Sequence, residues 1–216
     1  MASRRLRLSH IRAGFVGACL DPAWPLVVAI LSGIQAARVN DVEAALVAKL
    51  TCALRDDLAN VTDDEQFWRE QLFIVSPHHA QIRTIRRALT DKRVWQTRPF
   101  VDTVDKMQGQ EADAVLISYG VADPEYAAIE AEFIYGRNRL NVAITRARLK
   151  SIVFLPKPLL DATPEVLDSP VVAEGLAYMR GLIQLARRHG DTSSFDVGQG
   201  AVLEVVRLVV EVLGQA

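Results

Sequence analysis

Between residues 26 and 155, short apolar runs rich in β-branched residues alternate with longer amphipathic stretches. This alternation constrains the fold more than any other feature of the sequence. Runs that are apolar almost throughout are typical of strands whose two faces are both covered. Amphipathic stretches between them indicate the helices that connect parallel strands. The sequence therefore predicts an α/β fold of three layers, in which a parallel sheet lies between two layers of helices.

Five of the apolar runs are expected to be strands, and two of the amphipathic stretches to be helices. Asn40 is a good N-cap for the first helix, whose apolar residues recur at helical spacing. The expected strands are Leu26–Leu31, Leu72–Val75, Phe100–Val104, Ala114–Tyr119 and Ser151–Leu155, and the expected helices are Val42–Leu58 and Pro77–Leu89.

A different pattern begins near residue 160, after two prolines have ended the last strand. We expect two helices here, Pro170–Arg188 and Ala201–Leu213, joined by a flexible loop over Gly190–Gly200. The second helix would have only a narrow polar stripe, so part of its apolar surface would be exposed and would promote self-association through residues 201–213. The predicted organisation is an N-terminal leader segment (1–20), one α/β domain (21–160) and a C-terminal helical extension (161–216).

Charge and cysteine content narrow the classes of function. The 25 Lys and Arg residues nearly cancel the 26 Asp and Glu residues, so a nucleic-acid site would have to be a local basic patch. The two cysteines form no metal-binding cluster with histidine, and we predict no metal site. No apolar stretch reaches the about 20 residues that span a bilayer, so we predict no membrane segment. Because the chain has only two cysteines, we expect a reducing, cytoplasmic compartment. The densest basic region, which would contact either a phosphate backbone or solvent, comprises Arg83, Arg86, Arg87, Lys92, Arg93 and Arg98.

Two stretches carry residues suited to phosphate or ribose. Val101–Ser118 reads as a strand, a polar turn and a second strand, and in the turn Gly109 permits close backbone approach while Glu111 offers an acceptor pair. Arg137–Lys150 places five basic residues around an apolar helical stripe that ends at Ala147, and arginine suits phosphate because its donor fork is always charged. Taken singly, the first stretch is better explained as an ordinary surface turn, and the second is typical of a solvated basic helix face.

Together, in this order and spacing, the two stretches resemble motifs V and VI of superfamily 1 helicases, in the branch of the nonsense-mediated-decay and flap-processing helicases. Phe73–Gln81 is similar to motif IV of that branch, and Asn40–Ala44 is similar to its Asn-x-x-Glu-Ala element. The resemblance covers residues 26–155. It implies a RecA-like domain of the P-loop NTPase type, the second of the two in the family.

The resemblance implies roles for five residues in the two longest motifs. Arg146 is similar to the arginine finger that stabilises charge on the γ-phosphate. Gly109 and Glu111 match motif V residues beside the nucleotide. Thr103 and Val104 match the part of motif V that faces the nucleic-acid strand.

Three further residues match positions near the nucleotide. His78 and Gln81 are placed where motif IV approaches the base and phosphates. Arg139 matches the first part of motif VI, where it is either nucleotide-facing or structural. The family often has a tyrosine where this chain has His78, and an arginine where it has Asn138.

Two elements of an ATPase site are missing from the 216 residues. There is no G-x-x-x-x-G-K-S/T string and no acidic box after a strand to hold magnesium. The resemblance therefore implies the carboxy-terminal motor domain of an ATP-dependent helicase, sharing ATP and Mg²⁺ with a P-loop domain in cis or in trans and inactive alone. Its other expected partner is single-stranded nucleic acid, with DNA favoured. The alternative is a non-catalytic module, derived from such a helicase, that binds nucleic acid or protein.

Overall fold

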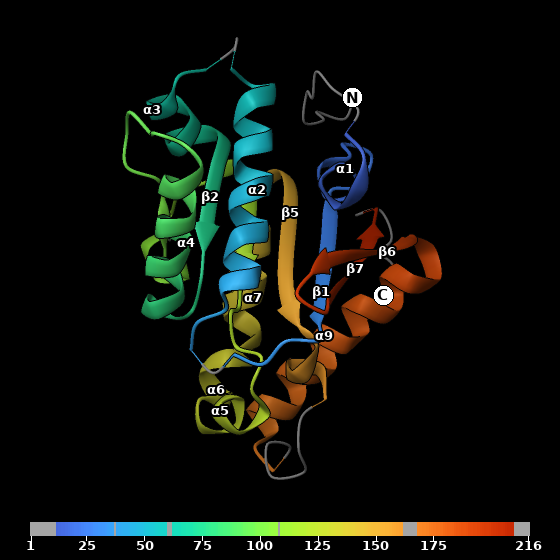
Figure 1. The fold of residues 1–216 in the computed structure, drawn as a ribbon. Helices are drawn as coiled ribbons and strands as arrows, with labels where there is room; N and C mark the ends of the chain where they lie inside the picture. Colours follow the sequence, from blue (N-terminus) through green and yellow to red (C-terminus); the bar gives the residue numbers. More distant parts are fainter. Residues whose placement is uncertain (1–11, 37, 60–61, 108, 162–167, 210–216) are drawn as a thin grey trace.

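The computed structural model describes residues 12–36, 38–59, 62–107, 109–161 and 168–209, which form one seven-stranded sheet with helices on both faces (Figure 1). The strand order is β3-β2-β4-β5-β1-β7-β6. The first five strands of this order pair in parallel, and the last two add an antiparallel hairpin beside β1. The strands are β1 Leu26–Ser32, β2 Leu72–Val75, β3 Val101–Asp102, β4 Ala112–Ser118, β5 Ala147–Pro156, β6 Asp191–Gly198 and β7 Ala201–Leu208.

Each face of the sheet has its own hydrophobic core. Alternate residues of β1 point to opposite sides: Val27 packs with the helices of one layer and Val28 with those of the other. The first layer comprises α1 Gly14–Leu20, α2 Asp41–Asp57 and α4 His79–Lys92, with the short α3 Asp64–Gln66 and the π-helix η1 Phe67–Gln71. The second comprises α5 Pro124–Ile129, α6 Ala131–Ile134, α7 Arg137–Thr145 and α9 Pro170–His189, with the 3₁₀ helices η2 Val104–Met107 and η3 Lys157–Leu160.

The predicted three-layer fold is confirmed, and most elements lie within a few residues of their expected bounds. The side chain of Asn40 accepts a hydrogen bond from the Glu43 backbone, 3.0 Å away, and caps α2 as expected. The strand expected over Phe100–Val104 is shorter, because the chain turns into η2 after Thr103. The expected leader overlaps α1, whose apolar side chains join the first core, while residues 1–11 lie outside the described residues.

The helix expected over Ala201–Leu213 is wrong, and so is the flexible loop expected over Gly190–Gly200. Both segments form strands, joined by a tight turn in which Gly198 and Gly200 have positive φ angles of 89° and 74°. The apolar residues of β7 are covered on both sides, by the first core at Leu203 and by the second at Val206. A strand covered on both faces is continuously apolar and lacks the alternation that separates strand from helix.

Self-association through a 201–213 helix loses its basis with this correction. Leu203, Val205, Val206 and Leu208 are fully buried within the chain. Residues 210–213 lie outside the described residues. Of the helices that the structure describes, none combines the length and the apolar character needed to cross a membrane.

The helical stripe expected to run as far as Ala147 is also shorter. Helix α7 ends at Thr145, Arg146 follows as its C-cap, and β5 begins at Ala147. Arg148 and Lys150 are therefore strand residues, whose side chains alternate across the sheet.

Candidate functional site

Arg146 lies at the corner where α7 ends and β5 begins. Its backbone carbonyl accepts a hydrogen bond from Ala112 N, 3.1 Å away, and Ala112 pairs with Ala147 at the start of the two parallel strands. Glu111 directly precedes Ala112, so the structure brings the turn of the first motif and the arginine of the second together. We call this pair, Glu111 and Arg146, the open corner.

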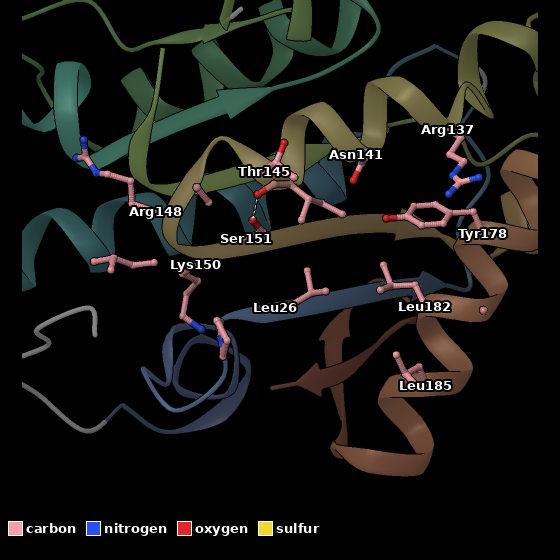
Figure 2. Close-up of a pocket in the computed structure, with 15 residues that line it drawn as sticks. Leu26, Arg137, Asn141, Thr145, Arg148, Lys150, Ser151, Tyr178, Leu182 and Leu185 are labelled. Carbon is pink, nitrogen blue, oxygen red and sulfur yellow. Dashed lines mark hydrogen bonds between the residues drawn. The ribbon is translucent and has the colours of Figure 1, made fainter. Parts of the chain in front are cut away.

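Arg146 differs from the other basic residues of its motif in having no partner among the described residues. Its Nε atom is buried and unbonded, whereas each of the other four basic side chains of the motif contacts a group of this chain. Figure 2 shows Arg148 and Lys150 on β5 near this corner and Arg137 at the opposite end of α7. The partners are Glu174 for Arg137 (2.7 Å), the Phe133 ring for Arg139 (4.2 Å), Asp113 for Arg148 (2.8 Å) and the Trp24 carbonyl for Lys150.

The turn before Glu111 depends on Gly109. Its φ angle of 81° lies in the left-handed region that other residues rarely adopt, and no neighbour would crowd a side chain there. Gln110 N donates to the Met107 carbonyl at 3.0 Å and closes the turn. Glu111 is exposed and has no hydrogen bond or ion pair within the described part of the chain. The carboxylate is therefore free to accept from a ligand.

Thr103, Val104 and Arg139 lie together elsewhere, at the edge where the parallel strands end. They line a small cavity of about 30 Å³ with Pro77 and Phe133. Arg139 and Arg146 are seven residues apart, which corresponds to roughly 10 Å along a helix. Arg139 therefore lies with Thr103 and Val104, about two helical turns from Arg146.

His78 occupies the N-cap position of α4 near this second edge, without a capping hydrogen bond from its side chain, and is largely buried. Its Nδ1 atom lies 3.4 Å from a carboxylate oxygen of Glu130, and its ring centroid lies 5.8 Å from that of Phe133 and 6.0 Å from that of Tyr126. Burial lowers the pKa of His78, against the opposing effect of Glu130. Its Nε2 atom is buried without a partner among the described residues and could donate to or accept from a ligand.

Gln81 belongs to a buried polar network that its motif did not reveal. Its Oε1 accepts from Asn40 N at 2.9 Å, and its Nε2 donates to the Asn40 carbonyl at 3.2 Å and to Ser118 Oγ at 3.3 Å. Glu43 Oε1 in turn accepts from Ser118 Oγ at 2.6 Å and from Gly120 N at 3.0 Å. Gln81 is fully buried and fully bonded, so the expected contact with a nucleotide has no support in this geometry.

We call this set of five residues, Asn40, Glu43, Gln81, Ser118 and Gly120, the closed network. It ties the starts of α2 and α4 to the end of β4. Burial raises the pKa of Glu43 to about 8, against the opposing hydrogen bonds from Ser118 and Gly120. Sequence reasoning missed Glu43 and Ser118 as partners, because no local spacing signals a contact between residues 75 positions apart.

A larger groove of about 730 Å³ lies beside the open corner, between α7, α9 and the starts of β1 and β5 (Figure 2). Leu26, Leu182 and Leu185 give it an apolar wall. Its cations are engaged elsewhere, since Arg148 pairs with Asp113 and Lys150 donates to a carbonyl. Arg137, which also lines the groove, pairs with Glu174, so each cation of this lining already has a partner in the chain. Within the described ranges, no group of three or more His, Cys, Asp or Glu side chains could hold a metal ion.

Comparison with known proteins places these motifs in one family. The sequence profile of a family described as "AAA domain" matches residues 31–155, which is more than half of the chain. "Probable RNA helicase armi" of Drosophila melanogaster is 35% identical over 100 residues, covering 44% of this chain and 8% of that protein. "DNA replication ATP-dependent helicase/nuclease JHS1" of Arabidopsis thaliana is 30% identical over 127 residues, covering 58% of this chain and 8% of that protein. "Helicase sen1" of Schizosaccharomyces pombe is 31% identical over 100 residues, covering 45% of this chain and 6% of that protein.

These relatives are much longer than the segment they share with this chain, which matches less than a tenth of each of the three. The matched family segment contains both the closed network and the open corner.

Proposed function

Because this chain belongs to the AAA-domain family of the superfamily 1 helicases, we propose that it is the carboxy-terminal motor domain of such a helicase. In this role it supplies Arg146 to ATP bound on a P-loop domain, in cis or in trans, and holds part of a single-stranded nucleic acid. The printed names of the relatives divide between RNA and DNA. The free thiols of Cys19 and Cys52 agree with a reducing, cytoplasmic compartment.

The observation that carries the proposal is the unpartnered guanidinium of Arg146. A buried nitrogen donor without an acceptor is costly, and phosphate oxygens are among the strongest acceptors for arginine. Arg146 therefore fits a polyphosphate placed against the open corner. Four other basic side chains of the same motif already have partners in the chain, so they are poorer candidates.

ATP with Mg²⁺ would supply a phosphoanhydride whose hydrolysis develops negative charge on the γ-phosphate oxygens. The residues of this chain would orient and stabilise: Arg146 donates to those oxygens, and Glu111, freed by the turn at Gly109, accepts from a ribose hydroxyl. The lysine on the phosphates and the ligands of the metal would come from the P-loop domain.

Nucleic acid would lie along the other edge, over Thr103 and Val104. Arg139, whose guanidinium carbon lies 4.2 Å from the centroid of the Phe133 ring, gives this edge a positive charge. His78 lies close by with an unpartnered ring nitrogen. An edge of this kind would contact one strand through its phosphates and sugars.

The test is steady-state ATP hydrolysis by the pure chain, by its P-loop domain and by the two together, with and without single-stranded oligonucleotide. We expect turnover only from the combination, with stimulation by the oligonucleotide. Arg188→Ala, which changes an exposed arginine of α9, is the control for loss of charge. Robust hydrolysis by the pure chain, abolished by Arg146→Ala, would contradict the half-site. No hydrolysis by the combination, with nucleic-acid binding retained, would favour the non-catalytic module.

A further inference from the structure

A second basic site lies beside the outermost strand of the sheet, which directly precedes Thr103 and Val104. A cavity of about 390 Å³ opens beside β3, the outermost strand, between η1, α4 and the loop that precedes β3. We call it the β3-edge pocket. Its charged lining consists of Arg69, Arg86, Arg98, Glu65 and Asp102, with Trp68 and Phe100 among its apolar walls.

Arg86 is fixed in this pocket by the backbone. Its Nη2 atom donates to the Val101 carbonyl at 2.6 Å and lies 3.7 Å from a carboxylate oxygen of Asp102. Its Nε atom is buried and has no partner among the described residues. The guanidinium is therefore held in place with part of its hydrogen-bonding capacity unused.

Arg98 adds a second positive charge that nothing in the described chain neutralises. It is exposed, forms no ion pair with a described residue, and lies close enough that its charge lowers the pKa of Arg86, after the larger effect of burial. Two like charges facing one cavity repel each other, and an anion bound between them would attract both.

The donors left free in the lining indicate the kind of anion. Arg69 is engaged by Glu70 at 3.0 Å, so Arg98 and the unbonded Nε atom of Arg86 are the arginine donors that remain for a ligand. Two such donors suit one singly charged group such as a phosphodiester. An acidic peptide would bring several carboxylates to a site that already contains two.

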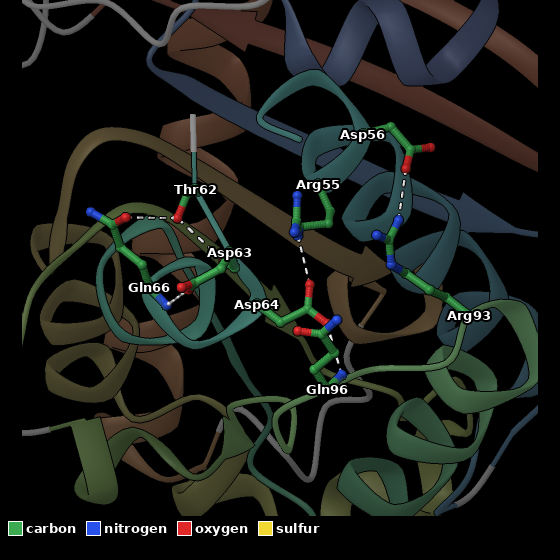
Figure 3. A network of polar contacts seen from close by, with 8 residues as sticks. All are labelled: Arg55, Asp56, Thr62, Asp63, Asp64, Gln66, Arg93 and Gln96. Atoms are coloured by element: carbon green, nitrogen blue, oxygen red, sulfur yellow. Dashed lines mark hydrogen bonds and ion pairs between the residues drawn. The ribbon is translucent and has the colours of Figure 1, made fainter. Parts of the chain in front are cut away.

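The loop that carries Arg98 is anchored by the network in Figure 3. Gln96 N donates to Asp64 Oδ2 at 2.8 Å, and the other oxygen of Asp64 forms a buried ion pair with Arg55, also at 2.8 Å. Arg93 pairs with Asp56 at 2.8 Å. Because the loop is already ordered, binding an anion at its end loses less conformational entropy.

We propose that the β3-edge pocket binds a phosphodiester of the nucleic-acid strand, through Arg86 and Arg98, as a contact additional to Thr103 and Val104. The inference rests on the proposed function, since it requires that the chain binds nucleic acid. It assigns to part of the basic region of α4 and the following loop a partner other than solvent.

Fluorescence anisotropy with a labelled single-stranded oligonucleotide tests the proposal, using the full chain at several salt concentrations. Arg98→Gln should weaken binding by about threefold to tenfold and reduce the slope of log affinity against log salt by about 0.7, as for the loss of one phosphate contact. Arg188→Gln removes the same charge from an exposed position on α9 and should change neither value appreciably. Because Arg98 is exposed, the variant should fold, which its thermal unfolding curve verifies.

The outcomes separate this inference from the proposed function. If the unmodified chain binds the oligonucleotide and the two variants behave alike, the β3-edge pocket is not a phosphate site and the proposed function stands. If the unmodified chain does not bind, both are overturned. If Arg98→Gln loses binding of labelled poly-glutamate with unchanged oligonucleotide affinity, the pocket serves an acidic protein and the inference is wrong.

Discussion

The closed network and the open corner are both built from motif residues of one family, yet they are opposite in their hydrogen bonding. In the closed network the side chains of Glu43 and Gln81 are buried and bonded to groups of the same chain. In the open corner Glu111 and Arg146 have no side-chain partner among the described residues. Membership of a motif therefore does not by itself indicate contact with a ligand. Polar groups that have partners within the chain stabilise the fold, and those without such partners are available to bind a ligand.

The difference follows from the cost of leaving a buried polar group unbonded, about 1–3 kcal/mol for each group. The closed network avoids this cost by tying three elements together. At the open corner the Nε atom of Arg146 bears it in the absence of ligand. A site that is less stable than it could be is typical of positions retained for activity.

Among the substitutions that test the contrast between the closed network and the open corner, the largest change is expected in the ATP turnover of Arg146→Ala. In the enzyme that contains both motor halves, Arg146→Ala should lower ATP turnover by about 10³–10⁵, the range of arginine fingers, because charge on the γ-phosphate loses its stabilisation. Nucleotide affinity, measured with a fluorescent analogue, and the melting temperature should change little. An unfolded variant would instead place Arg146 with the residues that stabilise the fold.

A substitution in the closed network should lower the stability of the fold, whereas the substitution of Arg146 should lower turnover. Glu43→Ala removes the acceptor of Ser118 and Gly120 and should lower the free energy of unfolding by about 2–4 kcal/mol, measured by urea denaturation. Glu111→Ala is the matched control, because that carboxylate is exposed and unpaired among the described residues. Equal losses in the two variants would remove the distinction between the regions.

The titration of Glu43 gives a pH-dependent effect with a defined sign. Its pKa is raised from 4.5 to about 8 in the folded state, so the folded state holds the proton more tightly than the unfolded state. The stability from this group is complete below the unfolded pKa and is lost as the pH rises through about 8. Stability measured from about pH 5 to about pH 8 should therefore fall more steeply in the unmodified chain than in Glu43→Gln. Parallel curves would show that Glu43 is ionised throughout.

The smallest effect is expected at Arg148, next to the open corner. This arginine is partly exposed, pairs with Asp113 at 2.8 Å and donates to the Glu70 carbonyl at 2.8 Å. Arg148→Ala should cost about 0.5–1 kcal/mol of stability and should change turnover by less than about tenfold. A loss of turnover equal to that of Arg146→Ala would mean that the two arginines act together on the phosphate.

The sequence predicts the parallel part of the sheet well, because each strand there is short and bounded by helical stretches. The strand Leu72–Val75 has the same bounds in the structure. The prediction from the sequence fails at β7, because burial on both faces removes the alternation of polar and apolar residues that identifies a strand. The motifs locate Arg146, but its lack of a partner depends on where Glu174, Phe133 and Asp113 lie in three dimensions. The contact of Glu43 with Ser118 is likewise a property of the folded chain.

The hairpin beside β1 has a consequence for biosynthesis. Ser32 in β1 bonds to Val202 in β7, 170 positions later, so the inner strand remains uncovered on that side until the end of the hairpin is made. At typical rates of translation this interval lasts roughly 10–30 s. During that time β1 presents unpaired backbone groups on an apolar strand, which other nascent chains could pair with. Ribosome-bound chains that stop before residue 201 should therefore bind chaperones more strongly than chains that extend beyond residue 208.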